Sequence, residues 1–164
     1  MDEIQRMQDN LLLIRRAVGW TAEEFGTQIG VTRQTINNIE SGRNRLTKTQ
    51  YIAMRSVLDA EIAKYPDETE MLKTILDVFI DHPDKCKKED RECLITKANL
   101  VAPSILAGTA TRKAVSKEWM QAAGALGVAA VIAAGPIGMV GGIMGAWLMK
   151  VADNTDKKKK KGEE

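Results

Sequence analysis

The chain has few of the residues on which enzymes and metal proteins most often rely. Its 164 residues include one histidine, His82, and two cysteines, Cys86 and Cys93. With a single histidine and no nucleophile at a recognisable spacing, neither a Ser-His-Asp nor a Cys-His arrangement is indicated. The glycine-rich stretch 135–145 lacks the Lys-Ser/Thr pair of a phosphate-binding loop. We therefore expect no catalytic residues and no cofactor, and predict that the protein is not an enzyme.

The two cysteines lie in a charged stretch, DHPDKCKKEDREC, which also contains His82 and Asp84. These side chains are metal ligands by type, but their spacing matches no standard zinc pattern. A disulfide is a second alternative. Because Met1–Asn10 is polar and no signal peptide is expected, and because cytoplasmic proteins seldom keep disulfides, we expect two reduced thiols and no metal site.

What the sequence does contain is two capped helix starts, between Thr21 and Gly42. Thr21 and Glu24 have the spacing of a capping box, which predicts that a helix begins after Thr21. Gly30 allows that helix to end in a sharp turn, and Thr32 caps the next helix, which closes at Gly42. Two short helices joined in this way are typical of a helix-turn-helix DNA-binding motif.

The second of these helices has a narrow apolar stripe, formed by Ile36 and Ile39. The polar positions left on its other faces are Arg33, Gln34, Asn37 and Asn38. Arginine can bond bidentately to guanine, and glutamine or asparagine to adenine, while the first turn of a recognition helix points into the major groove. A polar, solvated helix in a simple hairpin is the alternative. We favour base contacts by these four residues.

Residues 11–58 resemble the lambda-repressor-like, Cro and Xre family of helix-turn-helix domains. The resemblance rests on a run of Leu, Arg, Gly, Thr, Glu, Gly, Val, Thr, Ile and Glu-x-Gly at the family spacing. It implies a repressor-like regulator of transcription that binds double-stranded DNA. It also implies that Arg15 pairs with Glu40 as a structural clamp. The phosphate contacts expected by this analogy are Thr21, Thr32, Thr35, Arg43, Arg45 and Lys48.

Two positions depart from the family pattern. Ala22 stands where many members carry a glutamine that touches phosphate, so we expect a weaker phosphate contact there. Gly26 replaces the small alanine at the helix crossing, and glycine costs about 1 kcal/mol of helix propensity relative to alanine. Neither change argues against the fold.

The chain has no strong net charge, with 24 basic against 22 acidic residues. Its first 60 residues hold eight basic and seven acidic side chains. Affinity for DNA must therefore come from local placement of charge and from dimerisation, since one module with few phosphate contacts binds weakly at cellular salt. We expect a homo-oligomer, with a dimer on a palindromic operator as its natural form.

Helical periodicity continues beyond this region, so the predicted fold class is all-α. We expect a helix over 67–80, a loop over 82–92, and a further helix that Pro103 kinks. The predicted organisation is a five-helix helix-turn-helix domain (1–65), a helical middle region (66–108), a linker (109–118), an apolar glycine-rich helical segment (119–149) and a charged tail (150–164).

The apolar segment has no ionisable residue in 31 consecutive positions, from Trp119 to Met149. This exceeds the roughly 20 residues that a helix needs to span a bilayer, and Trp119 and Trp147 would suit the two interfaces. Small residues at every fourth position would let helices approach closely. The helix-packing residues that we expect are Ala134, Gly138, Gly142 and Ala146.

Three interpretations of this segment remain open. In the first, which we favour, it attaches a cytoplasmic DNA-binding domain to the cell membrane. In the second, it belongs to a membrane-active or pore-forming glycine-zipper protein that the N-terminal domain regulates. In the third, it is buried against a partner protein in a soluble oligomeric regulator or antitoxin. A single span and a hairpin bent at Pro136 also remain open, because basic residues flank both ends.

Overall fold

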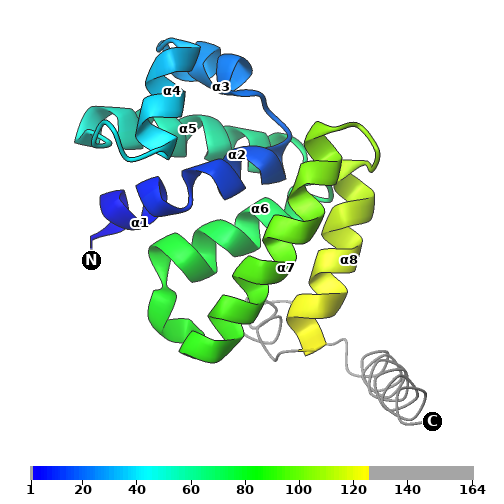
Figure 1. Cartoon of the computed structure of the whole chain (residues 1–164). Coiled ribbons are helices and arrows are strands. Elements are labelled where there is room, and N and C mark those ends of the chain that lie inside the picture. Colours follow the sequence, from blue (N-terminus) through cyan, green and yellow to red (C-terminus); the bar gives the residue numbers. More distant parts are fainter. Residues whose placement is uncertain (1, 126–164) are drawn as a thin grey trace, which may run out of the picture. The chain divides into compact units, whose positions relative to one another are not determined.

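The computed structural model describes residues 2–125, and all regular elements in this range are helices (Figure 1). In chain order they are α1 (Glu3–Asp9), α2 (Leu11–Val18), α3 (Ala22–Ile29), α4 (Arg33–Glu40), α5 (Lys48–Lys64), α6 (Glu70–Ile75), the π-helix η1 (Leu76–Asp81), the 3₁₀-helix η2 (Pro83–Lys85), α7 (Lys88–Leu106) and α8 (Arg112–Ala125). The predicted all-α fold, with five helices in the N-terminal region, is confirmed.

A first compact unit ends at Met120, and it includes both the predicted N-terminal domain and the predicted middle region. Helix α2 packs along α7 and against α6, while α1 contacts η1. Apolar side chains from both regions are buried where these helices meet. The fully buried side chains include Met7, Leu11, Ile14, Phe25, Ile36, Met54, Leu58, Leu72, Ile75, Ile80 and Leu94.

The middle region has more helix than the sequence predicted. The helix expected over 67–80 is present as α6 followed by η1. The loop expected over 82–92 is shorter, because η2 begins at Pro83 and α7 at Lys88. Pro83 suits the first position of η2 because the proline ring presets φ to a helical value. The acidic residues in the first turn of α7 stabilise that helix because they lie at the positive end of its dipole.

Residues 109–118, predicted as a linker, instead contain the first half of α8. Thr111 caps this helix, since its hydroxyl oxygen accepts a hydrogen bond from the backbone N–H of Ala114 at 3.2 Å. Gly108, with φ +70°, makes the turn that precedes it. The small and hydroxylated residues that suggested a linker therefore form a short connection between α7 and α8.

Trp119, which the sequence predicted at a membrane interface, is 2% exposed in the compact unit. It lies four residues after Val115, which is also buried, so the two share one face of α8. Beside them, the Ser116 hydroxyl donates to the backbone oxygen of Glu68 at 2.9 Å. This hydrogen bond fastens α8 to the turn just before α6.

Among residues 2–125, no helix is both long enough and apolar enough to cross a membrane. The apolar segment predicted over 119–149 begins inside α8, which ends at Ala125. Its remainder from residue 126 lies outside the described residues, as does the charged tail. The same holds for the predicted helix-packing residues Ala134, Gly138, Gly142 and Ala146.

Candidate nucleic-acid interface

Helices α3 and α4 begin at the residues expected from their caps. The Thr21 hydroxyl oxygen accepts from the N–H of Glu24 at 3.1 Å, and the N–H of Thr21 donates to the Glu24 carboxylate at 2.7 Å. This backbone hydrogen bond lowers the pKa of Glu24 below its ordinary value. Gly30, with φ +76°, ends α3, and Thr32 caps α4 by accepting from the N–H of Thr35. Both helix starts are therefore set by local hydrogen bonds.

The two helices cross at Gly26, where there is no room for a side chain. A Cβ atom at this position would lie 2.6 Å from the backbone oxygen of Val31. The N–H of Val31 in turn donates to the backbone oxygen of Gly26 at 2.9 Å. The glycine thus permits a closer approach of α3 to the start of α4 than alanine would.

We predict that Gly26→Ala destabilises the protein by about 1–3 kcal/mol, the usual cost of overpacking. In an exposed helix the same change would stabilise by about 1 kcal/mol, so the sign of the effect tests the crossing. Urea unfolding measures it, with Thr27→Ala on the exposed face of α3 as the control. Equal or greater stability of Gly26→Ala would contradict the crossing geometry.

The predicted base-contacting residues lie along one exposed part of α4. Arg33 and Gln34 are exposed in its first turn, and Asn37 and Asn38 are half-buried one turn later. The Gln34 amide donates to the Asn38 side-chain oxygen at 2.9 Å. Within residues 2–125, the side chains of Arg33 and Asn37 have no hydrogen-bonded partner, so their polar groups are available to a ligand.

The pair implied by the resemblance is present, since Arg15 Nε lies 2.5 Å and Nη2 lies 3.2 Å from the two Glu40 carboxylate oxygens. Both side chains are 9% exposed. A third bond runs from Arg15 Nη1 to the backbone oxygen of Trp20 at 2.9 Å. The guanidinium therefore joins the end of α4 to α2 and to the turn before α3.

The loop after α4 carries Arg43 and Arg45, and Lys48 follows in the first turn of α5; all three are exposed. The residue that fastens this loop is Gln8 of α1, which the sequence did not reveal. Its amide donates to the backbone oxygens of Ile39 and Asn44 at 3.0 and 2.8 Å, and its side-chain oxygen accepts from the N–H of Leu46 at 2.9 Å.

Residues 11–64 match a family model described as helix-turn-helix. This segment is a helix-turn-helix domain. It covers about a third of the chain, and it agrees with the resemblance seen in the sequence. No curated protein and no solved structure matches the chain. Helix-turn-helix domains place their second helix in the major groove of DNA, so the match supports a DNA-binding role for this segment.

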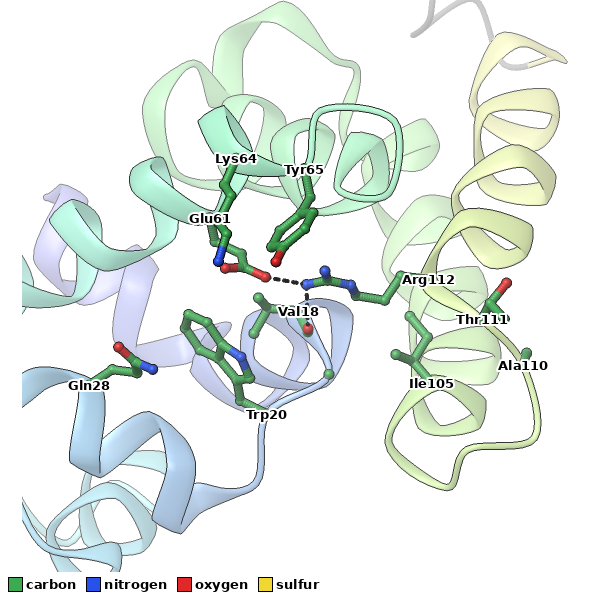
Figure 2. A pocket seen from close by; sticks show the side chains of 11 residues that line it. Val18, Trp20, Gln28, Glu61, Lys64, Tyr65, Ile105, Ala110, Thr111 and Arg112 are labelled. Carbon is green, nitrogen blue, oxygen red and sulfur yellow. Dashed lines mark hydrogen bonds and ion pairs between the residues drawn. The ribbon is translucent and has the colours of Figure 1, made fainter.

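The helix-turn-helix domain is joined to α8 through Arg112 (Figure 2). The guanidinium contacts the carboxylates of Glu61 and Glu68, donates to the backbone oxygen of Val18 at 3.3 Å, and lies 5.1 Å from the centre of the Tyr65 ring. Burial acts to lower the pKa of Arg112, but the bonds to the two carboxylates raise it above its ordinary value. Arg112 thus stays charged and holds the start of α8 against the domain.

Trp20 lines a hollow of about 480 Å³ at this junction (Figure 2). It is half-buried, and its ring centre lies 5.8 Å from that of Phe25. Tyr65 and Arg112 line the opposite part of the hollow. The indole therefore borders the junction between the helix-turn-helix domain and the α7–α8 region.

The cysteines are both free thiols, Cys86 buried and Cys93 exposed. Burial raises the pKa of Cys86, which disfavours the thiolate that metal binding requires. In the described part of the chain, no three His, Cys, Asp or Glu side chains are grouped as metal ligands. His82 contacts the Asp77 carboxylate through Nδ1 at 2.7 Å.

Proposed function

We propose that the protein is a repressor-like regulator that recognises an operator sequence and binds it as a dimer. The supporting observation is the first turn of α4, where Arg33 and Gln34 are exposed and Arg33 has no hydrogen-bonded partner within residues 2–125. A guanidinium and an amide at the start of a recognition helix are suited to bidentate bonds with guanine and adenine. Asn37 and Asn38 extend this surface by one turn.

Phosphate contacts would position the domain around this helix. The threonine caps lie at the starts of α3 and α4, and the exposed cations lie on the loop after α4 and at the start of α5. Contacts of this kind set register and orientation but do not read sequence. The proposed phosphate-binding residues are Thr21, Thr32, Thr35, Arg43, Arg45 and Lys48.

We predict that Arg33→Ala combined with Gln34→Ala removes sequence preference and leaves the fold intact. Each lost bidentate contact costs about 1–3 kcal/mol of discrimination between bases. The measurement is selection from a randomised duplex library by the wild-type protein and the variant, followed by titration of the selected duplex. Lys48→Ala is the matched control, since loss of one phosphate contact should weaken binding to all sequences alike and reduce the salt slope by about one. An unchanged selected sequence would contradict the assignment.

We further propose that residues 126–149 attach the regulator to a membrane. These 24 positions contain no ionisable residue and still exceed the roughly 20 that a spanning helix needs. Lys157–Lys161 follow in the sequence, and a run of lysines near a membrane surface is attracted to anionic lipid.

The prediction is that the full chain stays in membranes washed with alkaline carbonate, while a chain ending at Ala125 is recovered in the soluble fraction. The shorter chain keeps all of α8 and hence the contacts of Arg112 and Trp119, so its circular dichroism should show a folded helical protein. Recovery of both chains in the soluble fraction would instead indicate that the apolar segment is covered by protein.

A further inference from the structure

The end of α7 lies near the helix-turn-helix motif. Leu106, its last residue, lines a hollow of about 390 Å³ together with Thr21, Arg33 and Asn37. The first of these caps α3, and the other two are proposed base contacts. Leu106 is 37% exposed, so an apolar side chain from outside the helix-turn-helix motif borders the surface where DNA is expected.

This position is held by contacts on both sides of the connection between the two helices. Before it, Ile105 packs so close to Gly19 that a Cβ atom on the glycine would lie 2.9 Å from Ile105 Cγ2. After it, Arg112 bonds to Val18 and Glu61, as Figure 2 shows. Residues 106–111, here named the α7–α8 corner, are therefore fixed relative to α2 and α5.

The width of the major groove suggests how a bound duplex would reach the corner. The groove is about 12 Å wide and admits one helix, so the sugar-phosphate strands pass on either side of α4. A side chain that shares a hollow with Arg33 and Asn37 is next to one of these strands. The corner itself has no acidic residue, and Ala107, Gly108 and Thr109 are small and exposed, which leaves room for a phosphate strand. One acidic side chain, the exposed Glu23 of α3, lines the same hollow.

We propose that the α7–α8 corner is part of the DNA-binding surface, with Leu106 beside the phosphate strand that flanks the groove read by α4. This inference rests on the proposed operator binding and extends it beyond the residues of the helix-turn-helix motif. The ligand is duplex DNA, and the contact is to its backbone, so it adds affinity and orientation without reading bases.

The test places a charge at Leu106 and compares it with the same charge at Leu100. Leu100 lies on the same helix and is 74% exposed, so Leu100→Lys and Leu100→Glu are matched controls for fold and net charge. The probe is the duplex selected by the wild-type full chain, with binding measured from 50 to 200 mM salt. Circular dichroism checks that all four variants are folded.

We expect Leu106→Lys to bind about three- to tenfold more tightly at 50 mM salt and to steepen the log-log salt slope by about 0.9, as one added phosphate contact does. Leu106→Glu should bind more weakly by a similar factor, and the two Leu100 variants should bind within about twofold of wild type. The inference is overturned if the Leu106 variants behave like the Leu100 variants. It is also overturned if Leu106→Glu binds more tightly than wild type, because a negative charge beside a phosphate strand must weaken binding.

The two proposals fail in different ways. Failure of the wild-type chain to select any duplex would remove the proposed operator binding and this inference with it. A wild-type chain that selects a duplex, together with variants that do not differ by position, would remove only the role of the α7–α8 corner.

Discussion

Replacing Glu40 by leucine is expected to lower the free energy of unfolding by about 3–5 kcal/mol, the usual cost of removing one partner of a buried ion pair. The change would leave the guanidinium of Arg15, a residue that is 7% exposed, with one remaining bond, to the backbone oxygen of Trp20. Urea unfolding measures the effect. If the slope of the unfolding free energy against urea concentration is unchanged, a lower midpoint reports lower stability.

A second substitution separates the ion pair from simple packing. Arg15→Met in the Glu40→Leu background removes the unpaired charge, so stability should recover in large part, as apolar replacements of buried pairs often do. The exposed pair Lys88 and Glu92, with side chains 77% and 66% exposed, is the control, and Glu92→Leu should change stability by about 0.5 kcal/mol or less. Equal losses of stability at Glu40 and Glu92 would show that the buried pair stabilises the fold no more than an exposed pair does.

Replacing Trp119 by alanine is the second change with a large expected effect, a loss of about 3–5 kcal/mol. The indole is 2% exposed, and its removal would leave a cavity between α8 and the rest of the compact unit. Thermal and urea unfolding of the full chain measure the loss. The N–H of this indole has no hydrogen-bond partner within the described residues, so Trp119→Phe, which keeps much of the apolar volume, should cost less than Trp119→Ala.

This substitution also decides between two places for Trp119. If it belongs to the core of the compact unit, Trp119→Ala lowers stability and leaves recovery in carbonate-washed membranes unchanged. Reduced membrane recovery with unchanged stability would favour the interfacial position that the apolar composition of 119–149 predicted.

The parts of the fold that the sequence predicted well depend on contacts between near neighbours. Thr21 and Glu24, and Thr32 and Thr35, are three residues apart, so their hydrogen bonds can be read from spacing alone. The pairing of Arg15 with Glu40 spans 25 residues, and it was expected only because the segment resembles a known family.

The features that the sequence did not predict depend on distant partners. Ser116 bonds to Glu68 across 48 residues, and Arg112 bonds to Glu61 across 51 residues. Patterns within a few neighbouring residues of the sequence cannot predict such pairs. The change in composition at Trp119 suggested a boundary there, although the helix continues through it. Gln8 was overlooked for the same reason, because its three partners become adjacent only when α1 lies beside the end of α4.

The docking of α8 has a mechanical consequence. A linker over 109–118 would have given the DNA-binding domain about ten residues of slack, enough to swing freely about whatever held the rest of the chain. With Arg112 and Trp119 both seated in the compact unit, that slack is absent. A load applied to the chain after α8 would first pull on these two residues, and through Val18 and Glu61 on α2 and α5 of the helix-turn-helix domain.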